Sequence, residues 1–417
     1  MKSMNRSLII LILLAGIEIY VWQGFKTILQ DSSKLTKSIV TFTYFTFSIL
    51  TLFSFFMASY KGNVMFDYTI FKVLFLICFM LLLSKLFFLV FLLLEDVTRL
   101  IRWVFSAVKT VSVEGNGISR LKFISMTGAV VGALPFAAMT YGIIKGAHDY
   151  KITRVPLKLK NLPDSFVGKT LVQISDLHTG SFWDKKAVFK GIQSVIDLKP
   201  DMVFFTGDLV NNKETELDEY KEIYSQIKAP LGVYSVLGNH DYGDYITWDL
   251  DKKTHEKLKA QNLKDLIQTQ KEMGWDLLLN ENREIKVGND SLIVVGIENY
   301  GTGGFVQHGN MPEAMEGVDP KKNILLLSHD PSHWKFQVVE EYKMVDAMFS
   351  GHTHGAQFGI ETEKFKWSPI QLRYKEWAGL YKHKEQQLYV NRGFGYLGYP
   401  GRFGIRPEIT LLTLEKG

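Results

Sequence analysis

The sequence predicts an α/β protein preceded by an N-terminal bundle of about four transmembrane helices. Long apolar runs fill the first 150 of the 417 residues, whereas the remainder has the composition of an ordinary soluble domain. In that remainder, strand-like apolar runs alternate with helical patterns, which is typical of α/β domains. We therefore expect a transmembrane domain at residues 1–148 and a soluble domain at residues 149–417.

Four runs are long enough to cross a bilayer, which takes about 20 apolar residues. They lie at Ser7–Phe25, Ser38–Tyr60, Thr69–Leu94 and Phe123–Ile144. The fourth is richer in Gly and Ala, which suits close packing between helices. No small-x-small site follows the first run, so we expect no cleavable signal peptide. The single cysteine, Cys78, rules out an intrachain disulfide framework.

The basic residues around these runs predict the orientation of the chain in the membrane. The first and third loops hold eight of them: Lys26, Lys34, Lys37, Arg99, Arg102, Lys109, Arg120 and Lys122. The opposite side holds three: Lys2, Arg6 and Lys61. Because basic loops stay in the cytoplasm, we expect a multi-pass protein of the cell membrane whose soluble domain is extracytoplasmic. The basic residues after the fourth run argue the other way, but the rule is weak for long domains.

Two charges lie inside the predicted spans, Glu18 in the first and Lys85 in the third. Each could reach toward the interface or face water. Because a lone charge at depth is costly, the two could instead form a buried ion pair between parallel helices. Between Arg99 and Lys122, apolar side chains among basic ones allow either an amphipathic surface helix or a plain loop.

In the soluble domain, five predicted buried strands end in polar residues of the kind that bind metals. These strands are Leu171–Ser175, Met202–Thr206, Gly232–Leu237, Asn323–Ser328 and Val345–Phe349. Between them we expect helices at Lys185–Leu198, Glu214–Ile227 and Asp249–Lys271, and a hairpin joining Arg283–Val287 to Ser291–Ile297. Because ligand sites of open α/β sheets form at the carboxyl ends of strands, these polar residues are expected to meet in one pocket.

Asp176 and His178 follow the first of these strands. At spacing i, i+2 in an extended chain they point the same way, and a carboxylate beside an imidazole suits a divalent metal. Alone, such a pair is more often a turn with a chance histidine. Four further blocks change that balance: Gly207-Asp208, Gly238-Asn239-His240-Asp241, His329 and Gly351-His352-Thr353-His354. Half of the ten histidines thus lie at strand ends, which random placement would not produce.

In this order, the five blocks resemble the calcineurin-like metallophosphoesterase superfamily, over residues 170–416. The tail from Asn391 to Glu408, with its glycines and arginines, resembles the bacterial YkuE/YaeI-like branch of membrane-associated phosphodiesterases. The resemblance implies a four-layer α-β-β-α sandwich. Asn211 and Asn212 stand where the protein phosphatase branch has Asp-Arg, which weakens a protein-phosphatase interpretation. No specific family is suggested for residues 1–150.

The resemblance also implies a site for two divalent metal ions, among which Mn, Fe, Zn and Ni are not distinguished. One ion would be held by Asp176, His178, Asp208 and His354. The other would be held by Asp208, Asn239, His329 and His352. His240 would face the substrate phosphate as a catalytic residue, with Asp241 orienting its ring.

Elementary chemistry agrees with these roles. A carboxylate can give one oxygen to each of two ions, and Gly207 allows close approach beside Asp208. A hydroxide between the ions would be nucleophilic near neutral pH and would attack phosphorus. A protonated His240 could then protonate the leaving alkoxide.

We therefore expect a membrane-anchored metallophosphoesterase that hydrolyses phosphodiester or phosphomonoester bonds, with a lipid-linked or envelope substrate as one option. The alternative is a catalytically silent binding or scaffold protein, which would be expected to lose ligand positions that this chain keeps. No nucleic-acid partner is expected, because no basic stretch with interleaved aromatics is present. Arg392, Arg402 and Arg406 are less settled, because they could grip a phosphate or belong to a structural loop. The other histidines, His148, His255, His308, His333 and His383, have no matching context and are expected to be surface or helix residues.

Overall fold

The computed structural model describes residues 2–65, 69–106 and 120–417. These residues form two compact units, Met1–Tyr141 and Gly142–Gly417. Each unit is described separately below.

The first unit consists of long helices. They are α1 (Lys2–Ile28), α2 (Lys34–Met65), α3 (Thr69–Ser106) and α4 (Arg120–Ile144), of which α4 ends just inside the second unit. All four are long and apolar enough to cross a membrane, with candidate spans at Leu8–Ile28, Lys34–Tyr60, Thr69–Ile101 and Lys122–Ile144. The four predicted membrane helices are thus confirmed.

Small residues bring α4 close to α3. A Cβ atom placed on Gly132 would lie 2.9 Å from Cβ of Phe88 and 3.1 Å from the carbonyl oxygen of Ser84. Gly128 is similarly close to Phe91. A larger side chain at either glycine would force the helices apart, so the small residues of the fourth run do serve close packing.

Of the two alternatives for Glu18 and Lys85, the structure shows the buried ion pair. Lys85 Nζ lies 2.9 Å from Oε1 and 2.8 Å from Oε2 of Glu18. Ser48 of α2 also donates to this carboxylate, and the hydroxyl of Tyr44 donates to the carbonyl oxygen of Glu18. These contacts satisfy both charges inside the bundle and join three helices, as buried charges in a membrane require.

The segment between Arg99 and Lys122 is described only at its two ends. Residues up to Ser106 continue α3, and Arg120 begins α4. Residues 107–119 lie outside the described residues. The choice between a surface helix and a loop concerns these residues, so it lies outside the described part of the chain as well.

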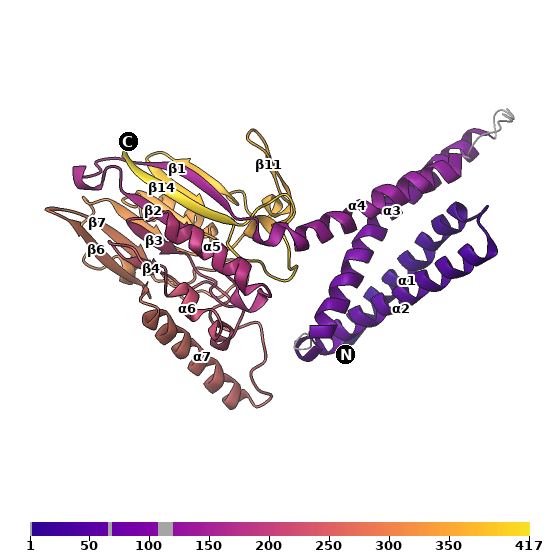
Figure 1. Ribbon diagram of the computed structural model, residues 1–417, viewed down its shortest axis with the longest axis horizontal. Coiled ribbons are helices and arrows are strands. Elements are labelled where there is room, and N and C mark those ends of the chain that lie inside the picture. Colours follow the sequence, from indigo (N-terminus) through magenta and orange to yellow (C-terminus); the bar gives the residue numbers. More distant parts are fainter. Residues whose placement is uncertain (1, 66–68, 107–119) are drawn as a thin grey trace. The chain divides into compact units, whose positions relative to one another are not determined.

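The second unit contains two six-stranded sheets. The first has the order β1-β14-β2-β3-β4-β5 and the second the order β12-β13-β9-β8-β7-β6. Strands β1, β14, β2, β3 and β4 of the first sheet lie side by side in Figure 1. The strands of the first sheet are β1 (Lys151–Leu159), β14 (Glu408–Lys416), β2 (Thr170–Ile174), β3 (Met202–Phe205), β4 (Val233–Ser235) and β5 (Asp276–Leu277). Those of the second are β12 (Gly379–His383), β13 (Gln386–Val390), β9 (Ala347–Ser350), β8 (Ile324–Leu327), β7 (Asp290–Gly296) and β6 (Glu281–Val287). A two-stranded ribbon, β10 (Ile360–Glu361) with β11 (Lys366–Trp367), lies apart from them.

Three apolar cores hold the sheets and helices in four layers. Between the sheets, residues such as Leu171 and Phe204 pack with Leu325 and Phe349. The outer face of the first sheet packs on α5 (Lys185–Asp197) and α6 (Lys221–Tyr224), with α7 (Lys252–Glu272) contributing Leu266. The outer face of the second packs on α8 (Met311–Ala314) and on the turns Trp334–Val338 and Val339–Glu341. The predicted α-β-β-α sandwich is thereby confirmed.

Most predicted elements are observed, but the helix expected at Glu214–Ile227 is wrong. A 3₁₀ turn at Glu214–Leu217 and the short α6 replace it. The carboxylate of Glu216 accepts from the backbone N–H groups of Asn211, Asn212 and Lys213, so this segment closes a loop instead of continuing a helix. Strands β1 and β12–β14 were not predicted; β1 and β14 pair in parallel along nine residues each.

Candidate metal centre

The carboxyl ends of five strands, three from the first sheet and two from the second, bring the predicted site residues together. Asp176 and His178 follow β2, Asp208 follows β3, Asn239 and His240 follow β4, His329 follows β8, and His352 and His354 follow β9. The central strands β2–β4 are mutually parallel, and so are β7–β9. Within each sheet the carboxyl ends of these strands therefore share an edge, where a ligand site of an α/β fold is expected.

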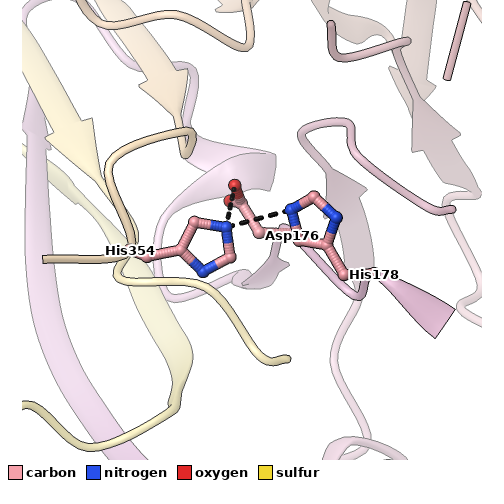
Figure 2. Close-up of side chains that lie close together, drawn as sticks. All are labelled: Asp176, His178 and His354. Carbon is pink, nitrogen blue, oxygen red and sulfur yellow. Dashed lines mark hydrogen bonds and ion pairs between the residues drawn. The ribbon is translucent and has the colours of Figure 1, made fainter. Parts of the chain in front are cut away.

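The first group of donors is Asp176, His178 and His354. Nε2 of His354 lies 3.0 Å from Nε2 of His178 and 3.2 Å from Oδ1 of Asp176. Figure 2 shows the two rings and the carboxylate turned toward one another. All three residues are buried, and one ligand atom from each lies within 4.8 Å of the others.

The second group is Asp208, His329 and His352, with Asn239 beside it. Nε2 of His329 lies 3.1 Å from Oδ2 of Asp208. Nδ1 of His352 lies 3.3 Å from Nε2 of His329 and 2.9 Å from the side-chain oxygen of Asn239. Their ligand atoms also lie within 4.8 Å of one another.

Asp208 links the two groups. The oxygen that contacts His329, Oδ2, also lies 3.4 Å from Nε2 of His178. Two imidazole nitrogens facing each other across 3.0 Å, as at His178 and His354, need a proton or a cation between them. The donor set of oxygen and nitrogen atoms therefore suits divalent cations, and Asp208 contacts both donor groups.

Backbone strain is concentrated in these residues. Five of the seven predicted ligands have left-handed backbone angles, with φ of 52° at Asp176, 48° at His178, 58° at Asp208, 69° at His352 and 50° at His354. Non-glycine residues pay roughly 1–3 kcal/mol for such conformations, which cluster at functional sites. The strands thus end in strained turns that aim donor atoms inward.

Contacts behind the rings fix which nitrogen faces the site. Nδ1 of His178 lies 3.1 Å from the side-chain oxygen of Asn211, and Nδ1 of His329 lies 2.7 Å from the carbonyl oxygen of Thr206. Both Nδ1 atoms must carry a proton to donate to oxygen, so Nε2 is the nitrogen of each ring that faces the site, where a bound cation would replace any proton on it. At His352 the arrangement is reversed: Nε2 meets the hydroxyl of Tyr374 at 2.8 Å and Nδ1 faces the site.

The electrostatics also favour cation binding. Burial lowers the pKa of His178 and of His352 to about 4, so both rings are neutral donors at physiological pH. Burial also lowers the pKa of His329, but the Asp208 carboxylate outweighs it and raises the value to about 10. An imidazolium at His329 thus balances the negative charge of Asp208. Bound divalent cations would supply that positive charge instead.

His240 lies beside the donor groups, but Asp241 does not orient it as predicted. Nδ1 of His240 lies 2.9 Å from the carbonyl oxygen of Asn211. The carboxylate of Asp241 instead accepts from four backbone N–H groups, those of Asp208, Leu209, Val210 and Gly238. Asp241 therefore shapes the loop that carries Asp208, and the Asn211 carbonyl orients His240.

The arginines of the tail have structural partners. Arg392 pairs with Glu408 and Glu361, and Arg406 pairs with Asp149. The buried Arg402 donates to the carbonyl oxygens of Gly395 and His354, and its Nη2 lies 3.2 Å from Nδ1 of His354. These contacts favour the structural-loop interpretation over a phosphate grip.

Several residues near the site were missed or misjudged from sequence. Asn211 supports two histidines, although it was noticed only as a departure from another branch. The ring of Tyr245 lies 4.3 Å from that of His240, and its hydroxyl accepts from the side chain of Asn239. His333 was expected to lie at the surface or in a helix. It lies in a helical segment, but its ring is fully buried between Ser328 and Gln337. None of these residues carries a local sequence signal.

Comparison with known families agrees with this geometry. Residues 4–147 match the family "Probable Calcineurin-like phosphoesterase, transmembrane domain", and residues 169–356 match "Calcineurin-like phosphoesterase". This chain carries a calcineurin-like phosphoesterase domain. The first match also gives the N-terminal helices a family, which sequence reasoning alone had not suggested.

Three relatives are similar in sequence to this chain. A Danio rerio transmembrane protein with metallophosphoesterase domain is 29% identical over 66% of this chain and 60% of its own. The UDP-2,3-diacylglucosamine pyrophosphatase LpxG of Chlamydia trachomatis is 29% identical over 60% of this chain and 86% of its own. The uncharacterized metallophosphoesterase YkuE of Bacillus subtilis is 27% identical over 64% and 86%. The chain thus spans about 60% of the length of the vertebrate relatives it matches.

Proposed function

We propose that the protein is a membrane-anchored, metal-dependent phosphoesterase, with residues 1–148 as its membrane domain and residues 149–417 as its catalytic domain. The observation that carries the proposal is the position of Asp208. Its Oδ2 lies 3.4 Å from His178 of one donor group and 3.1 Å from His329 of the other. An oxygen shared in this way is what a two-metal site requires.

Each donor group has a role in this proposal. Asp176, His178, Asp208 and His354 would hold one divalent ion, and Asp208, Asn239, His329 and His352 the other. Two such ions supply Lewis-acid activation of water and charge stabilisation on phosphoryl oxygens. The protein fixes the donors through strained turns and through hydrogen bonds behind the rings.

His240 is the proposed proton donor to the leaving oxygen. Its Nδ1 is held by the Asn211 carbonyl oxygen, so Nε2 is the atom free to face a substrate. The hydrogen bond fixes the ring, and the adjacent ring of Tyr245, tilted by 33° to it, limits its rotation. A positioned acid of this kind typically contributes about 10²–10⁴-fold to a rate.

The substrate is proposed to be a phosphate ester that is reached at the membrane, and a lipid-linked one fits best. The membrane helices support this, as does the name of the LpxG relative, a pyrophosphatase whose substrate carries acyl chains. The soluble domain is proposed to be extracytoplasmic on the basis of the basic residues in the first and third loops.

Sidedness can be measured with single cysteines, because the chain has only Cys78, which is buried. Lys384→Cys lies in the exposed turn between β12 and β13, and Gln30→Cys lies in the turn between α1 and α2. In intact cells, a membrane-impermeant maleimide should label the first and not the second. The reverse pattern would place the domain in the cytoplasm.

Hydrolysis of a bis-aryl phosphate and of a mono-aryl phosphate by the purified full chain tests the activity. Mn, Fe, Zn and Ni are to be added back singly after chelation. We expect metal-dependent turnover of at least one substrate. Tight binding of two ions without turnover of either ester would favour a binding protein with a silent site.

A further inference from the structure

An arginine that the proposed mechanism does not use lies at the rim of the metal centre. Arg373 is exposed and follows the 3₁₀ turn Pro369–Leu372. Its guanidinium carbon lies 5.1 Å from the ring centroid of Phe305 and 5.5 Å from that of Tyr374. Aromatic faces hold a guanidinium by cation–π attraction while leaving N–H groups free for a ligand.

Both aromatic rings contact His352, a proposed ligand. The rings of Phe305 and His352 lie 4.9 Å apart at 87°, and the Tyr374 hydroxyl lies 2.8 Å from Nε2 of His352. Adding the distances from His352 to Phe305 and from Phe305 to Arg373 places the guanidinium at most about 10 Å from the His352 ring. That range suits a group attached beside a bound phosphoryl group.

The segment carrying Arg373 is tied to the loop of the proposed ligands. The buried hydroxyl of Ser368 donates to the carbonyl oxygen of Gly355 at 2.7 Å, next to His354. The backbone N–H groups of Arg373 and Tyr374 both donate to the carbonyl oxygen of Ile370. The backbone that presents the guanidinium is thus fixed to the site.

The charge of Arg373 lacks a counter-ion within the described part of the chain. No carboxylate there forms an ion pair with it, whereas Arg392 and Arg406 each have an acidic partner. A guanidinium in this state offers paired donors that match the oxygens of a phosphate or carboxylate.

We propose that Arg373 determines specificity by binding a second anionic group next to the scissile phosphoryl group, so that the site prefers pyrophosphate diesters to simple phosphodiesters. The inference rests on the proposed phosphoesterase function and deepens it. A simple diester carries one anionic phosphate, which the metal centre would bind. A pyrophosphate diester brings a second phosphate, to which Arg373 offers an exposed guanidinium at the rim.

The test compares three substrates with the full chain in detergent and saturating Mn²⁺: a bis-aryl phosphate, a symmetrical diaryl pyrophosphate, and a diester with a carboxylate in place of the second phosphate. Arg373→Met should lower kcat/KM for the pyrophosphate by about 10- to 100-fold, mainly through KM, because a charged hydrogen-bonded contact is lost. Turnover of the bis-aryl phosphate should stay within about twofold. Arg373→Lys should recover part of the loss, and Lys375→Met, an exposed cation two residues away, should cause none.

Binding of methylenebisphosphonate by calorimetry gives a readout without turnover. Arg373→Met should weaken its binding while binding of methylphosphonate stays the same. Equal losses for all three substrates, or none, would overturn the role of Arg373 while the phosphoesterase function stands. A loss confined to the carboxylate diester would also overturn the pyrophosphate preference. A wild-type chain that hydrolyses none of the substrates would overturn the proposed function itself.

Discussion

Lys85 Nζ and Glu18 Oε2 lie 2.8 Å apart, on two membrane helices that are separated by 67 residues in sequence. Both side chains are almost entirely buried, so neither charge is solvated when its partner is removed. Lys85→Met should therefore destabilise the helix bundle by about 3–5 kcal/mol, because it leaves an uncompensated carboxylate. Unfolding of the detergent-solubilised chain by SDS titration measures this change.

The double variant Glu18→Gln/Lys85→Met is the matched control for that pair. It removes both charges and should recover much of the lost stability. Unchanged stability of Lys85→Met while Glu18 stays ionised would show that the pair does not hold the helices together.

Asp208→Asn should lose metal and turnover together. The amide cannot give an anionic oxygen to both donor groups, so two ions would repel without their shared ligand. Metal content after gel filtration, measured by elemental analysis, should fall well below that of the wild type. Asp319→Asn, at an exposed position, should keep both ions and full activity. Retention of two ions by Asp208→Asn would contradict the bridging role.

His240→Ala should separate catalysis from metal binding. Because His240 is not among the proposed ligands, metal content should match that of the wild type, while kcat should fall by about 10²–10⁴-fold. The fall should be smaller for substrates with a good leaving group, such as a nitrophenolate, because those groups need less protonation. Full activity toward a substrate with an alkoxide leaving group would refute the assignment.

His333 should make the protein sensitive to acid. Burial lowers its pKa from 6.5 to about 4, so the folded chain keeps this ring neutral where the unfolded chain protonates it. Above pH 6.5 the ring is neutral in both states and costs no folding free energy. As the pH falls from 6.5 toward 4, the free energy of unfolding decreases by roughly 3 kcal/mol, because only the unfolded chain takes up the proton. His333→Gln should reduce the fall in melting temperature between pH 7 and pH 4. His383→Gln, at an exposed hairpin position, should leave the fall unchanged, and equal behaviour of the two variants would contradict the role of His333.

Local patterns were enough to predict much of this protein. Apolar run length predicted the four membrane helices, and the polar residues at the strand ends predicted which donors would converge, because ligand sites of α/β folds form at the carboxyl ends of strands. That these ends belong to two packed sheets is seen only in the folded chain. For Glu18 and Lys85 the sequence left two alternatives open, because a lone charge can also reach the interface or face water; the contacts in the bundle chose the ion pair.

The amino-acid pattern alone predicted the membrane spans, the α/β class and the polar blocks at the strand ends, because each depends on a few neighbouring residues. The four layers and the sorting of the metal ligands came from the resemblance that those ordered blocks carry. Only the tertiary structure decided what surrounds those residues. Asp241 proved to bind backbone N–H groups, Asn211 to orient His240, and Arg373 to lie on Phe305, 68 positions away. Such contacts join loops that are distant along the chain and leave no periodic signal, so the folded chain alone reveals them.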